Sequence, residues 1–251
     1  MEKEKNISAQ NPNPISIACA KSLEDFERDY MPPRSSYALY RTSKSSDGST
    51  KSYKLGLYTP KTLSDADMTA CLHLIEKTSG VHYRGSRMGW SGRRKRKEME
   101  LWDLRYLVVR EDGLEGWEDV EGDGEGDENE EGERGEENDG GVVEDEKEKI
   151  TKEDEGGEIM GFMSFMPTLE DGIMVLYLYE IHLIDELRGT GLGTHLMKLL
   201  TSVAHAIPGI QKTMLTCFTA NEAALRFYAK LGYERDGCSP EPRRVTVLGG
   251  I

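Results

Sequence analysis

The sequence is poor in cysteine and has no long apolar run, and these absences exclude several classes of protein. Its 251 residues include four scattered cysteines, none in a C-x-x-C pair, which argues against a disulfide framework. Its five histidines have no spacing typical of a metal site. No apolar run approaches the roughly 20 residues that cross a bilayer, and the first twenty residues lack the pattern of a secretory signal. We therefore expect a reduced, intracellular protein without a bound metal.

Charge is distributed unevenly along the chain. The formal net charge is −14, yet residues 111–158 contain 24 carboxylates and 4 basic residues, whereas the rest of the chain has 22 and 28. This tract has no apolar face, so it cannot bury enough surface to offset the entropy of ordering, roughly 1–2 kcal/mol per residue. We predict a disordered acidic insertion over residues 111–158, placed between two strands.

The rest of the chain is predicted to form one domain behind a short tail. Residues 1–20 are polar with two prolines and are expected to be flexible, and residues 21–251 are expected to form a single domain that the insertion interrupts. Before the insertion, the patterns predict helices over 22–30 and 63–78 and strands over 53–58 and 104–110. After it, they predict strands over 159–166, 173–183, 212–218 and 245–248 and helices over 191–206 and 221–231. This order indicates a mixed α/β fold on one sheet.

A glycine-rich turn lies between the predicted strand 173–183 and the following helix. Its sequence is RGTGLG, from Arg188 to Gly193. Glycines at such a turn let backbone N–H groups surround an anion at the helix N-terminus. A Walker A loop would need a lysine that is missing, and a Rossmann turn would need a different spacing. A plain structural turn is the alternative, but R-x-x-G-x-G is typical of the GNAT acetyltransferases, which hold the pyrophosphate of coenzyme A there.

A second motif strengthens this resemblance. Residues 212–228 are predicted to form a strand, then Asn221, then a helix that carries Tyr228, and the segment ends with FYAKLGYE, as in many GNAT proteins. The stretch LYLYEIHL (176–183), together with Tyr83 and Gly89-Trp90, is similar to the NatD-type N-alpha-acetyltransferases, which acetylate the N-terminal Ser of histone 4 and histone 2A. The resemblance covers roughly residues 63–239, and Met88 stands where that family often has tryptophan. The implied fold is the GNAT fold, a mixed central sheet flanked by helices.

The resemblance implies three sets of site residues. The catalytic set is Glu180, Tyr179 and Tyr228, and the substrate-binding set is Tyr83, Trp90, Tyr179 and Thr216. The cofactor-binding set is His182, Leu183, Ile184, Arg188, Gly189, Thr190, Gly191, Leu192, Gly193, Thr194, His195 and Asn221.

The resemblance also implies partners and location. Acetyl-CoA is expected as the acetyl donor, without a metal, and the tails of histone 4 and histone 2A as acceptors. Association with the nucleosome or the ribosome, and residence in nucleus and cytoplasm, are further expectations, whereas a membrane or a sequence-specific nucleic-acid partner is not expected. The basic run Gly92–Lys97 is open to three interpretations: a nuclear-localisation patch, a phosphate-binding surface or a solvated helix face.

Glu180 is the candidate general base because it is an acid in an otherwise apolar strand, with His182 on the same face. Burial is expected to raise its pKa. An α-amino group, with a pKa near 7.7–8.0, suits a carboxylate base better than lysine, near 10.4. Two alternatives stay open: a lysine or small-amine acetyltransferase, and a non-catalytic histone-binding protein that uses the acidic tract. His182 is interpreted as supporting rather than catalytic, and Tyr228 either acts as the acid for the leaving thiolate or packs its helix.

Overall fold

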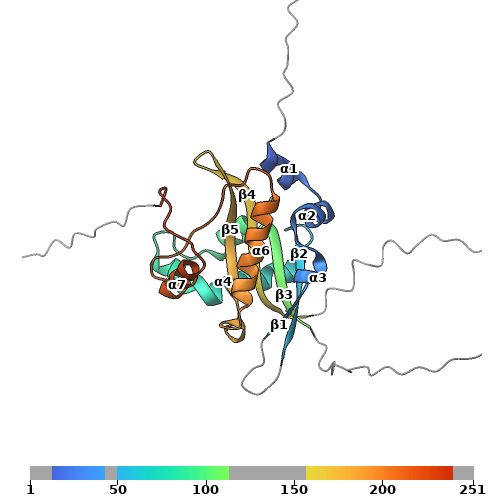
Figure 1. The fold of residues 1–251 in the computed structure, drawn as a ribbon. Helices are drawn as coiled ribbons and strands as arrows, with labels where there is room; N and C mark the ends of the chain where they lie inside the picture. The colour runs from blue at the N-terminus through green and yellow to red at the C-terminus, as the bar shows by residue number, and fades with distance from the viewer. Residues whose placement is uncertain (1–12, 43–49, 113–156, 240–251) are drawn as a thin grey trace, which may run out of the picture.

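A six-stranded sheet lies at the centre of the chain (Figure 1). The computed structural model describes residues 13–42, 50–112 and 157–239. The strands follow one another across the sheet in chain order, and every neighbouring pair is antiparallel except β5 and β6, which are parallel. The predicted mixed sheet is therefore confirmed. The strands are β1 (Leu39–Arg41), β2 (Ser52–Tyr58), β3 (Arg105–Glu111), β4 (Ile159–Glu170), β5 (Ile173–Leu183) and β6 (Lys212–Leu215).

Helices cover both faces of the sheet. On one face, the buried leucines of α6 pack in one core with residues of α2, and on the other face α4 and α5 enclose a second core. The sheet thus has two distinct sides, and the side to which a strand residue points decides which helices it meets. The helices are α1 (Pro14–Ala20), α2 (Leu23–Tyr30), α3 (Arg34–Tyr37), α4 (Asp65–Gly85), α5 (Gly92–Met99), the 3₁₀ turn η1 (Asp185–Leu187), α6 (Leu192–Ala206) and α7 (Glu222–Lys230).

Local sequence signals account for where several helices begin. The Ser22 side chain accepts a hydrogen bond from the amide of Asp25, and Ser64 does the same for Asp67, so both predicted N-caps are confirmed. Helix α4 continues to Gly85, seven residues beyond its predicted end.

The expectation of a loose tail up to residue 20 is wrong for its last part. Residues 14–20 form α1, which begins with a proline after an Asn13 cap, an arrangement that favours a helix start. Ala18 and Cys19 are buried, and Arg105 donates to the carbonyl of Cys19 at 3.1 Å. Tertiary contact therefore holds this segment. Sequence patterns also missed the short elements α3 and β1.

The predicted connection at 167–172 is shorter in the structure. Strand β4 continues through Pro167, and only Asp171 and Gly172, both with positive φ, form the turn to β5. Such a turn matches the twist of the two strands. Proline has no backbone N–H to donate to a neighbouring strand. Pro167 is tolerated because the pairing of β3 with β4 ends at Phe165, so β3 needs no hydrogen bond from position 167. Strand β6 ends at Leu215, three residues before its predicted end.

The acidic insertion connects two neighbouring strands. Strands β3 and β4 pair antiparallel, with Val109 opposite Gly161, close to both ends of the insertion. Residues 113–156, and the predicted strand 245–248, lie outside the described residues. Among the helices that are described, none is long and apolar enough to cross a membrane.

Candidate active site

A β-bulge in β5 lies at the centre of the site. Ser164 of β4 pairs with Glu180 and the next residue, Phe165, pairs with Leu178, so Tyr179 is an extra residue in β5. Before the bulge, Leu178 points into the core beneath α6. Strict alternation would send Glu180 there as well. The bulge reverses this and places Glu180 on the opposite face, beside α4 and α5, as its contacts show.

The Glu180 carboxylate is largely buried and has donors on both oxygens. Its side chain is 11% exposed. The Lys95 ammonium of α5 donates to Oε1 at 2.9 Å, and the Tyr83 hydroxyl of α4 approaches the same oxygen at 3.4 Å. The His182 Nε2 atom lies 2.6 Å from Oε2. Three elements therefore hold one carboxylate.

These contacts reverse the expected pKa shift of Glu180. Burial by itself raises the pKa of the carboxyl, but His182 and Lys95 together outweigh burial and lower it below its usual value. The sequence-based expectation of a raised pKa is wrong, because it did not include a cation from α5. The carboxylate is ionised at neutral pH and is only a weak base.

His182 connects Glu180 to α4. Its Nδ1 atom lies 2.6 Å from the Thr78 hydroxyl, whose single proton is directed either to this ring nitrogen or to the Leu74 carbonyl at 2.7 Å. The ring is 7% exposed and packs against Phe162. This side chain therefore orients the carboxylate, and the structure places it in the core with Glu180 rather than at the glycine turn.

Aromatic side chains surround the approach to Glu180. Tyr83 makes edge contacts with Trp90 at 5.3 Å and with Phe218 at 4.8 Å, measured between ring centroids. Tyr179 contacts Tyr177 edge-on at 5.3 Å. Together these rings come from α4, the segment before α5, β5 and the segment after β6, so the structure brings the predicted Tyr83, Trp90 and Tyr179 into one region.

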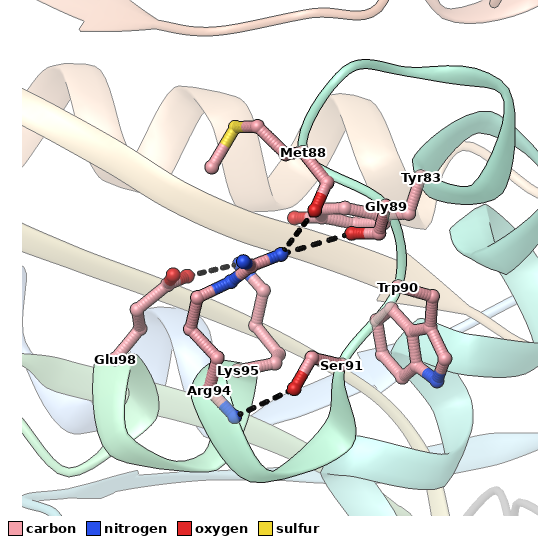
Figure 2. A pocket seen from close by; sticks show the side chains of 8 residues that line it. All are labelled: Tyr83, Met88, Gly89, Trp90, Ser91, Arg94, Lys95 and Glu98. Atoms are coloured by element: carbon pink, nitrogen blue, oxygen red, sulfur yellow. Dashed lines mark hydrogen bonds and ion pairs between the residues drawn. The ribbon is translucent and has the colours of Figure 1, made fainter.

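A small pocket opens next to this aromatic region (Figure 2). Arg94 spans it and donates to the carbonyls of Met88 at 2.6 Å and Gly89 at 3.0 Å, while the Lys95 ammonium meets Glu98 at 2.6 Å (Figure 2). The pocket is lined by Tyr83, Met88, Gly89, Trp90, Ser91, Arg94, Lys95 and Glu98. Lys95 thus separates this pocket from the buried Glu180.

Strands β5 and β6 part next to the bulge. Their parallel pairing runs from Val175 with Lys212 to Leu178 with Leu215 and ends there. The following segment of β5, which carries Glu180 and Leu183, continues beyond the end of β6. Beyond Leu178, β5 therefore has no pairing with β6, and its backbone groups on that side can meet an extended ligand.

The glycine turn has the geometry of an anion site. Gly189 and Gly191 have φ of 79° and 91°, a region that favours glycine. Gly191 is the N-cap of α6 and has no side chain to occupy the first-turn amides, and no acidic residue lies in that turn. The Tyr40 hydroxyl donates to the Thr190 carbonyl at 2.7 Å. The turn is therefore held open for an anion by β1.

Helix α7 closes the other side of the turn. A Cβ on Gly193 would lie 3.4 Å from the Phe227 ring and 3.8 Å from a methyl group of Leu183. Asn221 caps α7 by accepting from the amide of Ala224 at 3.1 Å. Tyr228 follows on α7, and burial first, then Cys217 and Glu180, raises the pKa of its hydroxyl well above the usual value. The turn, the end of β5 and α7 therefore converge.

Other predicted site residues are placed around this centre. Arg188 is exposed and pairs with Asp185 at 3.0 Å. Thr216 shares a hydrogen bond with Tyr177 on the neighbouring strand. The His195 ring packs against Tyr40, and burial lowers its pKa.

Sequence reasoning missed three contributors: Lys95, Thr78 and Tyr40. Lys95 was one residue of a basic run, yet it lies four residues before the buried Met99 and therefore on the inner face of α5. That spacing was a signal that could have indicated its burial. Thr78 and Tyr40 contact residues about 100 or more positions away, so local patterns carried no signal for them.

Comparison with known proteins agrees with this architecture. A model of the acetyltransferase (GNAT) family matches residues 98–233, more than half of the chain. The chain therefore belongs to the GNAT acetyltransferase family. N-alpha-acetyltransferase 40 of Saccharomyces cerevisiae is 26% identical over 211 residues, which are 74% of this chain and 58% of that protein. The chain thus spans less than two thirds of this relative's length.

Solved structures give a weaker likeness. The ribosomal-protein-alanine N-acetyltransferase of Brucella melitensis biovar Abortus 2308 is 14% identical, with a TM-score of 0.45 over 76% of this chain and 99% of that one. A putative acetyl transferase of Pyrococcus furiosus is 15% identical, with a TM-score of 0.42 over 76% and 100%. Neither adds to the conclusion from the family match.

Proposed function

We propose that this protein transfers the acetyl group of acetyl-CoA to the α-amino group of protein N-termini, with the N-terminal serines of histone 4 and histone 2A as substrates. The placement of the buried Glu180 carboxylate between the Lys95 ammonium at 2.9 Å and His182 Nε2 at 2.6 Å carries the proposal, because these partners lower its pKa and make it a weak base. Near pH 7, about a tenth of an α-amine is neutral, against less than about a thousandth of lysine. A weak base therefore suits an N-terminal acceptor. The similarity to an N-alpha-acetyltransferase supports the same choice.

The glycine turn fits the cofactor that the family uses. A Cβ on Gly191 would lie 3.0 Å from the Tyr40 hydroxyl, so there is little room for a side chain at this position. The turn therefore presents its backbone to the site. The amides from Thr190 to Thr194 would hold the pyrophosphate at the start of α6, whereas the predicted contact at the His195 amide is replaced by its hydrogen bond to the Gly191 carbonyl at 3.0 Å. When bound, acetyl-CoA supplies the acetyl group as a thioester.

The side chains around the end of β5 would handle the protons. Glu180 accepts the proton that the attacking amine releases, directly or through a water, and His182 keeps the carboxylate oriented. Tyr228 stays protonated because its pKa is raised, so its hydroxyl can donate to the departing thiolate. Tyr83, Trp90 and Tyr179 would line the path of the peptide.

The proposed partners and location follow from the same assignment. Histone tails would be met in nucleus and cytoplasm, and association with the nucleosome or the ribosome would bring them close. The acidic tract at 111–158, with 24 carboxylates, would attract basic tails at low salt.

Mass spectrometry on a Ser-Gly-Arg-Gly-Lys peptide tests the proposal. We expect acetylation at the α-amine when the protein and acetyl-CoA are present, and none on a peptide whose N-terminus is blocked beforehand. Acetylation confined to the lysine would support the lysine or small-amine alternative instead. Absence of product together with binding of the peptide would support the histone-binding alternative.

A further inference from the structure

We infer that Lys95 is a positioning residue that keeps the Glu180 carboxylate ionised and sets how it titrates. This inference rests on the proposed function in taking Glu180 as the base. It goes beyond that function because it assigns a role to a side chain in a basic run that would otherwise be a surface feature. Lys95 acts through its ion pair with Glu180.

The placement of Lys95 differs from that of its neighbours on α5. Arg93, Arg94 and Lys97 are exposed, whereas the Lys95 side chain is only 9% exposed. A buried ammonium is stable only when it is paired. Lys95 meets two carboxylates, Glu180 at 2.9 Å and Glu98 at 2.6 Å.

The ring of Tyr83 completes this binding site for the ammonium. The Lys95 Nζ atom lies 4.9 Å from the ring centroid, within the range of a cation–π interaction. The same Tyr83 approaches Glu180 through its hydroxyl. The aromatic residue predicted to bind substrate therefore also fixes the lysine beside the carboxylate.

Glu98 of α5 shares the Lys95 ammonium with Glu180, and five charged or titratable groups interact with Glu180 itself. They are Lys95 from α5, Tyr83 from α4, His182 from β5, and, at longer range, Tyr106 from β3 and Tyr228 from α7, whose pKa values the charge of Glu180 helps to raise. The three tyrosines are neutral at neutral pH. Lys95 is thus a cation in direct contact with Glu180, and its loss leaves burial opposed by His182.

Two neutral variants test this role. An opposite charge within hydrogen-bond distance lowers a carboxyl pKa by about 1–3 units, so Lys95→Gln and Lys95→Met should raise the pKa of Glu180 by that amount. Gln retains a hydrogen-bond donor and keeps the test available if Met disturbs folding. Lys95→Arg keeps the charge and should restore the original titration, and the exposed Lys97→Met is the matched control.

The first readout is an infrared titration of the protonated carboxyl band, with the Glu180→Gln form of each protein as reference. We expect the Glu180 band to appear at higher pH by about 1–3 units in Lys95→Gln than in the unmodified protein. Equal titration in the two proteins would overturn the inference. This readout does not require acetyl transfer, so it stands if the proposed substrate is wrong.

The second readout is the pH profile of kcat/KM with an N-terminal peptide. In the unmodified protein, the acidic limb should have a slope of one, set by the substrate amine. In Lys95→Gln, a second titrating group should steepen the lower part of that limb. A uniform loss of activity at every pH would show that Lys95 is only structural. If Lys95→Gln acetylates the peptide normally and its pH profile of kcat/KM equals that of the unmodified protein, the inference is rejected and the proposed function still stands.

Discussion

At the scale of single residues, the site depends on one carboxylate and the groups that hold it. Glu180 has donors on both oxygens, from Lys95 and His182, and lies among aromatic rings. A buried carboxylate with such partners loses conformational freedom and basicity together. Its chemistry is therefore set by neighbours on α4 and α5 rather than by its own strand.

Replacing Glu180 by Gln should slow acetyl transfer without affecting cofactor binding. Gln keeps the shape and one acceptor oxygen but removes the carboxylate oxygen that accepts a proton. The loss of a general base costs about 10²–10⁴-fold in rate. Steady-state kinetics would measure kcat, and calorimetric titration would measure acetyl-CoA affinity. Near-normal turnover between pH 6 and 9 would show that the carboxylate is structural.

Replacing Tyr228 by Phe tests the acid. Because the pKa of Tyr228 is raised above its usual value of about 10, its hydroxyl stays protonated, and the activity of the unmodified protein should show no alkaline limb below about pH 10. The variant should lose activity by about 10²-fold or more at every pH. Leu225→Phe, at an exposed position of the same helix, is the control and should keep full activity. Unchanged rates in Tyr228→Phe would assign the residue to packing.

At the scale of secondary-structure elements, the glycine turn and α7 define the cofactor side of the site. The turn lies between the end of β5 and the start of α6, and Phe227 from α7 lies against it. Tyr40 links the same turn to the edge strand β1. Its shape therefore depends on three elements that are distant in sequence.

Gly193→Val should abolish acetyl-CoA binding and leave the protein folded. Gly193 has no positive φ, so Val introduces no backbone strain, but its methyl groups would enter a space where the Phe227 ring is already 3.4 Å from a Cβ. Calorimetry should show the loss, with an unchanged melting curve. Gly237→Val is the matched control, because a Cβ there meets nothing within 4 Å. Unaltered affinity in Gly193→Val would place the cofactor elsewhere.

Tyr40→Phe should weaken acetyl-CoA binding moderately. The variant keeps the ring that packs on His195 and removes only the hydrogen bond to the Thr190 carbonyl. A hydrogen bond of this kind contributes about 0.5–1.5 kcal/mol, which corresponds to roughly a threefold to tenfold loss of affinity. Calorimetric titration measures it directly. An affinity equal to that of the unmodified protein would show that β1 does not shape the turn.

At the scale of the whole molecule, the acidic insertion is the largest unusual feature. It joins β3 to β4 at the edge of their pairing, where Arg110 donates to the carbonyl of Gly157 at 2.6 Å. Its composition predicts no contribution to the core.

Replacing residues 113–156 by a short Gly/Ser linker should leave the melting temperature nearly unchanged, since loop closure varies only slowly with length. Gly157 should be retained for its contact with Arg110. At low salt, the linker variant should have a higher KM for a basic peptide than the full protein. At high salt the two KM values should converge, because charges are screened within about 3 Å at 1 M. A second variant, with an uncharged Gly/Ser linker as long as the original segment, distinguishes the effect of the lost charge from the effect of the shorter loop. A large fall in melting temperature would show that the insertion is structured.

Local sequence determined the elements whose signals are short-range. Ser22 and Ser64 cap their helices as predicted, because a side-chain oxygen two or three residues from an amide depends on little else. The glycine turn, the composition of the insertion and the pairing of Glu180 with His182 on one face were also readable from the residues.

Tertiary structure decided on which face of the sheet Glu180 lies and which side chains it contacts there. The alternation of β5 would place Glu180 with Leu178, and only the bulge, set by register with β4, turns it toward α4. The direction of its pKa shift depends on His182 together with Lys95, which lies 85 residues earlier in the chain. Register and long-range ion pairing depend on how distant segments pack, so no local pattern contains them. The sequence by itself therefore determined the candidate base, and the packing of α4 and α5 against the sheet decided its ionisation.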